Sequence, residues 1–96
     1  MLVYKIDILK ELKLAGYNTN RIRKEKLISE SSLQNIRRGV MVRPDTLDAL
    51  CRLLEVQPGQ VIRYYSDIDY DNRLNAGQLA PYEINKEYVE QKENSK

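Results

Sequence analysis

The sequence contains 96 residues with a formal net charge of +2, a single Cys and no His. This length predicts one small domain. Because His is absent and Cys51 stands alone, the composition excludes a His-dependent nucleophile, a His or Cys zinc site and a disulfide framework; we expect neither an enzyme nor a bound metal or other cofactor. Since no long apolar segment and no signal-peptide pattern is present, we expect a soluble, cytoplasmic protein that does not enter membranes.

The charge is distributed unevenly along the chain. Residues 1–64 contain 12 Lys and Arg against 7 Asp and Glu, a net charge of +5, whereas residues 65–96 contain 4 against 7, a net charge of −3. A basic body with an acidic tail is typical of proteins that bind polyanions. The alternative is a solvated surface whose charges are uneven without any function.

Two short helices are predicted at the start of the chain. Apolar residues within 6–14 recur with a helical period, and Gly16 ends this segment. Residues 18–20 (Asn-Thr-Asn) offer N-cap side chains for a second helix over 21–26, in which Ile22 is the one clear apolar contact. Because so short a helix is not stable alone, it must pack against its neighbours.

A third helix is predicted over residues 30–38. Ser29 is suited to cap its N-terminus, and Gly39 to end it. Leu33 and Ile36 are expected to face the interior, and the remaining positions are polar. Its acidic start and basic end suit the dipole of the helix.

Two further helices complete the body. Pro44 begins a fourth helix, whose apolar residues fall at i, i+3, i+4 and i+7 and predict a stripe that faces the core: Leu47, Leu50, Cys51 and Leu54. On this stripe Cys51 is interpreted as a small core residue. Pro58 begins a very short fifth helix.

The composition changes near residue 65, which predicts a domain over 1–65 and an acidic, Tyr-containing extension over 66–96 that is partly disordered. Within the extension, residues 72–81 have loop composition, 82–91 form a marginal helix and 92–96 are expected to be disordered.

Both ends of the body have the composition of short strands. Residues 2–4 and 62–65 are apolar, aromatic or β-branched, so they are expected to pair as two strands that flank the helices. The pairing is predicted either within one chain or between two chains, and in the second case it forms a dimer contact.

The third helix also carries a resemblance to a known family. The run Leu-Ile-Ser-Glu-Ser-Ser-Leu-Gln-Asn-Ile-Arg-Arg-Gly over 27–39 resembles the recognition-helix signature of the Cro/cI-type (XRE) family. Segments 47–54 and 56–62 resemble the fourth and fifth helices of the same family. The resemblance covers residues 4–64 and implies an all-α, five-helix, lambda-repressor-like helix-turn-helix domain.

The function that this resemblance implies is sequence-specific binding to double-stranded DNA. Members bind operator DNA, usually as homodimers, and act mostly as transcriptional repressors or control switches in bacteria and phages. The helix over 29–38 is then expected to enter the major groove.

The resemblance places base-reading positions on the first, second and sixth residues of this helix, which are Glu30, Ser31 and Asn35, with Gln34 as an adjacent candidate. Asn and Gln pair with adenine, Ser contacts several bases and Glu accepts a hydrogen bond from cytosine N4. The alternative for the two amides is a solvated helix face. The positions that contact DNA phosphate in the family are Asn18, Thr19, Arg38 and Arg43, of which Asn18 is also a natural N-cap.

Two residues depart from the family pattern. Arg23 stands where most members have a small Ala, and Leu27 stands where they have a Gly in the turn. We expect either a changed angle between the two helices or an Arg23 side chain whose charged head turns outward to solvent or phosphate.

A second function remains open at this point. An antitoxin or anti-repressor on the same fold would bind a protein partner through the acidic extension, because a fold does not dictate a function. The sequence predicts neither the operator nor the direction of regulation.

Overall fold

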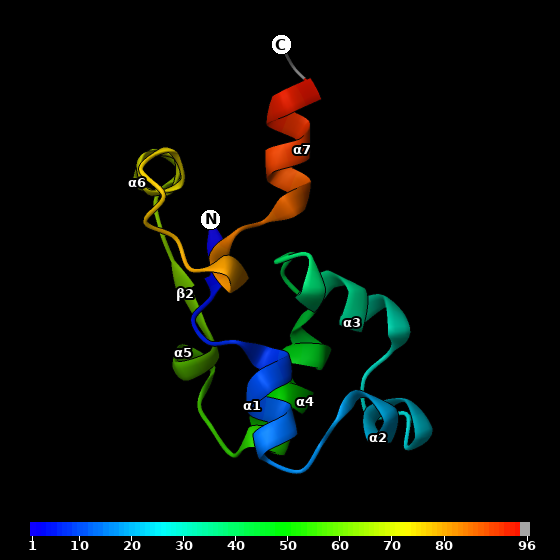
Figure 1. Cartoon of the computed structure of the whole chain (residues 1–96). Coiled ribbons are helices and arrows are strands. Elements are labelled where there is room, and N and C mark those ends of the chain that lie inside the picture. Colours follow the sequence, from blue (N-terminus) through cyan, green and yellow to red (C-terminus); the bar gives the residue numbers. More distant parts are fainter. Residues whose placement is uncertain (95–96) are drawn as a thin grey trace.

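A computed structural model describes residues 1–94 of the chain (Figure 1). The elements follow one another in the order β1 (Leu2–Tyr4), α1 (Ile8–Leu14), α2 (Thr19–Lys24), α3 (Glu30–Arg37), α4 (Pro44–Leu54), α5 (Pro58–Val61), β2 (Ile62–Tyr64), α6 (Asp67–Asn75), the 3-10 helix η1 (Pro81–Glu83) and α7 (Lys86–Asn94). Figure 1 shows α2 and α3 on one side of α1 and α4, the strands and α6 on the other, and α7 projecting from the body. The predicted five-helix body is confirmed.

Side chains cap the first three helices, at predicted places in α2 and α3. The Asn18 side chain accepts a hydrogen bond from the Arg21 amide at the start of α2, and Ser29 accepts one from the Ser32 amide at the start of α3. Asp7 caps α1 in the same way. These bonds satisfy amides that have no partner within the helix, which fixes where each helix begins.

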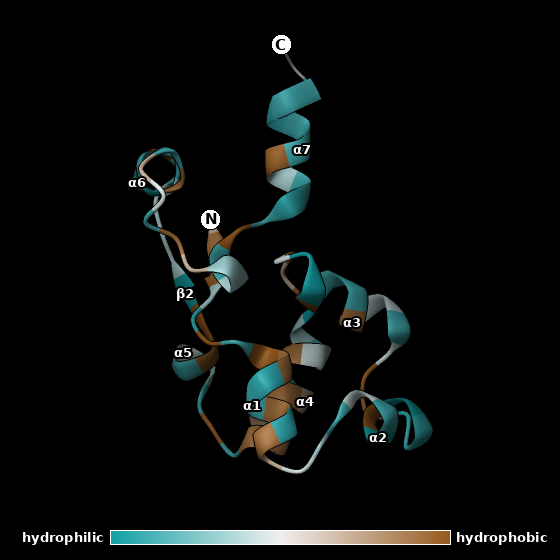
Figure 2. Cartoon of the chain, in the orientation of Figure 1, coloured by the Kyte–Doolittle hydropathy of each residue, from teal (hydrophilic) through white to brown (hydrophobic). Residues whose placement is uncertain are grey.

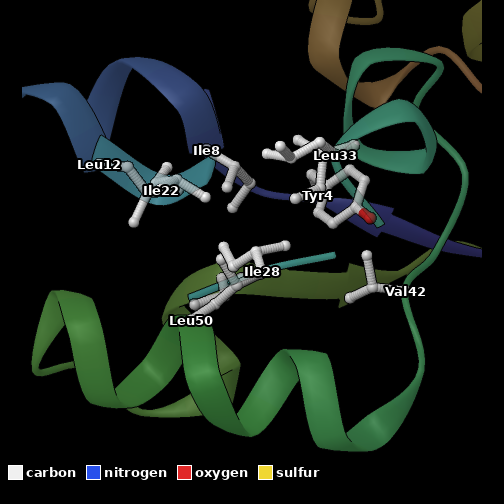
Figure 3. Close-up of a cluster of buried hydrophobic side chains, with 10 residues drawn as sticks. Tyr4, Ile8, Leu12, Ile22, Ile28, Leu33, Val42 and Leu50 are labelled. Carbon is white, nitrogen blue, oxygen red and sulfur yellow. The ribbon is translucent and has the colours of Figure 1, made fainter. Parts of the chain in front are cut away.

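The core lies where β1 and the first four helices meet (Figure 3). It is formed by buried side chains from these elements, from the segments that join them and from α5: Tyr4, Ile8, Leu12, Ile22, Ile28, Leu33, Ile36, Val42, Leu50 and Val61. Cys51 is half-buried against this cluster, as its place on the α4 stripe predicts. Figure 2 shows mainly hydrophilic residues on α2, α3 and α7, so these three helices present polar surfaces.

The two ends of the body pair within one chain. β1 and β2 are antiparallel, with Leu2 opposite Tyr64 and Tyr4 opposite Ile62. The buried Tyr4 hydroxyl donates a hydrogen bond of 2.6 Å to the Val40 carbonyl, which joins the sheet to the segment after α3. Of the two predicted pairings, the structure therefore contains the intramolecular one.

The extension is more ordered than the sequence predicts. Loop is the wrong prediction for residues 72–75, which complete α6. Ser66 caps that helix, and Asp67 and Asp69 in its first turn suit the helix dipole. The helix expected over 82–91 lies further along the chain, as α7 over Lys86–Asn94. Disorder is the wrong prediction for residues 92–94, which continue α7, and the last two residues of that prediction lie outside the described part of the chain.

Tyrosine side chains hold α6 and α7 together. The rings of Tyr70 and Tyr88 meet edge to face, with centroids 5.6 Å apart, and Tyr70 is fully buried. The Tyr88 hydroxyl donates to the Asp71 carboxylate at 2.7 Å, and Lys92 contacts the same carboxylate at 2.8 Å. These hydrogen bonds favour the charged form of Asp71, so they lower its pKa. The extension is thus a packed unit rather than a loose tail.

No helix within residues 1–94 has the length and apolar character needed to cross a membrane. In the same described part of the chain, no three His, Cys, Asp or Glu side chains gather as ligands for a metal ion.

Candidate nucleic-acid interface

The turn between α2 and α3 explains why Leu27 replaces the glycine of the family pattern. The residue with left-handed backbone conformation is Lys26, at a φ of 54°, and not Leu27. The amide of Leu27 donates to the Ile22 carbonyl and that of Lys26 to the Arg23 carbonyl, which together form a Schellman motif. Leu27 then packs against the core, so the apolar side chain helps to fix the turn.

The inner face of α3 attaches this helix to the body. Leu33 and Ile36 are buried in the core, as predicted. Ser32 is also buried, and its hydroxyl lies 3.1 Å from that of Thr46 at the start of α4. This contact fixes the rotation of α3 about its axis, which leaves the opposite, polar face outward.

The four predicted base-reading residues lie on that outward face, but they differ in solvent exposure. Glu30, Ser31 and Gln34 are exposed, whereas Asn35 is half-buried. The Ser31 hydroxyl lies 3.2 Å from the hydroxyl of Ser29, the N-cap of the helix. A polar face of this size is suited to the major groove, where amide, hydroxyl and carboxylate groups meet base edges.

Glu30 is held by a residue of the preceding helix. Arg23 donates from Nε and from Nη2 to the two different carboxylate oxygens of Glu30, each at 2.9 Å. The paired guanidinium lowers the pKa of Glu30, and the carboxylate raises the pKa of Arg23. The expected outward orientation of Arg23 is confirmed, since its charged head lies at the surface.

The predicted phosphate contacts lie at two places. Asn18 and Thr19 line a surface hollow of about 490 Å³ together with Lys10 and Lys13 of α1. Sequence reasoning did not single out these two lysines, although their spacing of three residues places both on one side of a helix. Asp7 lines the same hollow, so the two lysines leave it with a net positive charge, which suits a phosphate backbone.

The second place is the segment that follows α3. The guanidinium of Arg43 is exposed and lies 3.8 Å from the Asp45 carboxylate. Arg38, the C-cap of α3, forms an ion pair of 2.8 Å with Glu90 of α7. The structure thus brings Arg38 together with a residue of the acidic extension, a contact that no local sequence pattern predicts.

Two short helices joined by a tight turn, the second with a buried face and a polar outward face, define a helix-turn-helix domain. The sequence model of the Cro/C1-type helix-turn-helix DNA-binding domain matches residues 7–67. The chain therefore belongs to this family and is, in general terms, a DNA-binding transcription regulator. No curated protein and no solved structure matches the chain significantly.

Proposed function

We propose that the protein is a sequence-specific regulator that inserts α3 into the major groove of double-stranded DNA. The observation that carries this proposal is the orientation of α3. Leu33 and Ile36 are fixed in the core and Ser32 is bonded to Thr46, while the outward face remains polar and accessible. A helix fixed in this way presents its side chains to base edges without further rearrangement.

The proposal gives each predicted site residue a role. Base edges are read by side chains of the outward face of α3, and phosphates are bound at both ends of the helix-turn-helix: Glu30, Ser31, Gln34 and Asn35 for bases, Asn18, Thr19, Arg38 and Arg43 for phosphates. Because the body carries the excess of positive charge, it also attracts DNA irrespective of its sequence.

We further propose that the protein binds its operator as a homodimer, acts as a repressor or control switch, and works in the cytoplasm of a bacterial or phage-infected cell without enzymatic activity. Family membership supports regulation of transcription in general. A dimer suits the small reading surface of one α3, because two half-sites one helical turn apart double the number of base pairs read.

A protein-interaction module is the second candidate, with the extension as its binding surface. The observation in its favour is a group of exposed apolar side chains at the root of the extension. Tyr64 is 68% exposed and lies opposite Leu2, which is 45% exposed, and Ile68 at the start of α6 is 76% exposed. Exposed apolar side chains of this kind are common at protein interfaces.

Selection of bound DNA from a random duplex pool tests the proposal. We expect the full chain to enrich a palindromic consensus. Ser31→Ala and Asn35→Ala are each expected to cost about 1–3 kcal/mol of base discrimination while leaving non-specific binding nearly unchanged. Asn72→Ala, an exposed position on α6, is the control and should select the wild-type consensus. If nothing is enriched, or if the two α3 substitutions have no effect, the protein-interaction module is favoured instead.

A further inference from the structure

The extension is attached to the end of the recognition helix by three contacts that converge on two residues. The Lys86 amide at the start of α7 donates to the Arg38 carbonyl at 2.8 Å. The Arg38 guanidinium donates from Nη2 to Glu90 Oε2, also at 2.8 Å. Gly39, which follows Arg38, lies so close to the Ile84 carbonyl that a Cβ atom there would overlap it. Backbone and side chain of α7 are thus both fixed against α3.

The position of α7 is also fixed from its other side. Tyr70 of α6 accepts a hydrogen bond from the Asn85 amide at 2.9 Å and packs edge to face on Tyr88. Asp71 of α6 binds both Tyr88 and Lys92. Because these contacts fix the start and the middle of α7, Glu90 is presented to Arg38 by a supported helix and not by a free tail.

From these contacts we infer that the protein's own acidic helix occupies a DNA-phosphate site. This inference rests on the proposed function, in which Arg38 binds a phosphate at the end of α3. A guanidinium paired with Glu90 has to exchange a carboxylate for a phosphate when DNA binds. The extension therefore lowers the affinity of the body for DNA.

The solvent exposure of the Arg38–Glu90 ion pair sets how strongly Glu90 competes with a DNA phosphate. The side chains of Arg38 and Glu90 are 42% and 56% exposed, and an ion pair of this exposure is weak. Removal of the carboxylate alone is therefore expected to strengthen DNA binding by about two- to fivefold at low salt. The contact adjusts affinity and does not abolish binding.

The experiment compares binding of the full chain and four variants to a random-sequence duplex over a range of salt concentrations. Glu90→Gln removes the carboxylate that holds Arg38. Glu87→Gln is the matched control, because it changes the charge of the same helix by the same amount at an exposed position for which the structure gives no contact to Arg38. The third variant combines Glu90→Gln with Arg38→Ala and is compared with Arg38→Ala alone, because the loss of Arg38 weakens DNA binding by itself.

We expect Glu90→Gln to bind more tightly than wild type and than Glu87→Gln, with a salt slope steeper by up to about 0.9, the value for one additional phosphate contact. Arg38→Ala is expected to remove this gain. Equal affinities for the two Gln variants, or a gain that persists without Arg38, would overturn the inference and leave the proposed function intact. Failure of every variant to bind duplex DNA would overturn both.

Discussion

Arg23 of α2 and Glu30 of α3 form a two-point ion pair across the turn of the helix-turn-helix, with both N–O distances at 2.9 Å. A planar guanidinium that binds both carboxylate oxygens fixes the carboxylate in position as well as in charge. Glu30 is therefore held in one orientation at the N-terminal end of the outward face of α3.

We predict that Arg23→Ala broadens the DNA consensus at the base pair nearest the N-terminus of α3. A released Glu30 gains rotamer freedom, which is expected to reduce discrimination at that base pair by about two- to tenfold. Selection from a random duplex pool measures the change. Arg52→Ala serves as the control, because it removes an equal charge from an exposed ion pair with Asp48 on α4. An unchanged consensus in the Arg23 variant would show that the pair has no part in base reading.

Gly39 and Gly77 form a natural comparison for the contact between α3 and the extension. Both follow a helix C-cap with a positive φ, 69° and 67°, so substitution by Ala strains both backbones about equally, by roughly 1 kcal/mol. A Cβ at Gly77 meets no atom within 4 Å, whereas one at Gly39 overlaps the carbonyl of Ile84. We expect Gly39→Ala to lower the free energy of unfolding more than Gly77→Ala does.

Denaturant unfolding and limited proteolysis of the extension measure the two Gly variants. Protease sites on the C-terminal side of residue 76 should be cleaved faster in Gly39→Ala than in Gly77→Ala or wild type, because the clash separates the extension from α3. Equal destabilisation of the two variants, with equal rates of cleavage, would contradict the close approach of Ile84.

Acid is predicted to loosen α7. The pKa of Asp71 is lowered in the folded protein by Lys92 and Tyr88, so its contribution to stability is complete above the pKa of the unfolded chain and is lost as the pH falls. The protection factors of the α7 amides, which correct for the pH dependence of intrinsic exchange, should therefore fall below about pH 4, where an unpaired Asp is protonated. In Asp71→Asn these amides should exchange faster at neutral pH and show a weaker response to acid. A full acid response in that variant would assign the effect to other carboxylates.

Alkali is predicted to act on the core through Tyr4. Burial raises the pKa of this phenol, as it raises the pKa of Tyr70, so the neutral form is favoured in the folded state. The stability from this group is present below about pH 10 and is lost as the pH rises. Titration of phenolate absorbance should show Tyr4 and Tyr70 ionising only at a pH above that of an ordinary phenol, together with unfolding.

The hydroxyl of Tyr4 is also expected to contribute to stability at neutral pH. Tyr4→Phe removes the hydrogen bond to the Val40 carbonyl and should cost about 1–3 kcal/mol, measured by denaturant unfolding. Tyr64→Phe, at an exposed position on the same sheet, is the control and should unfold like wild type. A Tyr4→Phe variant as stable as wild type would mean that water satisfies the carbonyl equally well.

The body of the fold could be predicted from sequence because its signals are local. Ser29 and Asn18 cap helices through hydrogen bonds to amides three residues away, and Leu33 and Ile36 point inward because of helical periodicity. Such information lies within a few residues of the position concerned. The family signature over residues 27–39 depends on the same local positions, which is why the sequence predicts the helix-turn-helix.

The extension and the two charged pairs could not be predicted in this way. α6 and α7 have few apolar residues, and Tyr70 and Tyr88, which join them, are 18 residues apart in the sequence. Arg38 and Glu90 are separated by 52 residues, so neither residue carries a local sign of the other. The sequence predicts Glu30 and Arg38 as interface residues. The structure shows the partner of each, Arg23 for Glu30 and Glu90 for Arg38.

The extension is attached to the body at two places. It is covalently continuous with β2, where it begins, and α7 contacts Arg38 at the end of α3. In the displacement of Glu90 by a phosphate that we propose, the carboxylate remains tethered to the same molecule by the sheet and by the contacts of α6. Its effective concentration near Arg38 then stays on the order of millimolar, however dilute the protein is. Once DNA dissociates, the contact is expected to re-form in a unimolecular step, at a rate independent of the amount of protein in the cell.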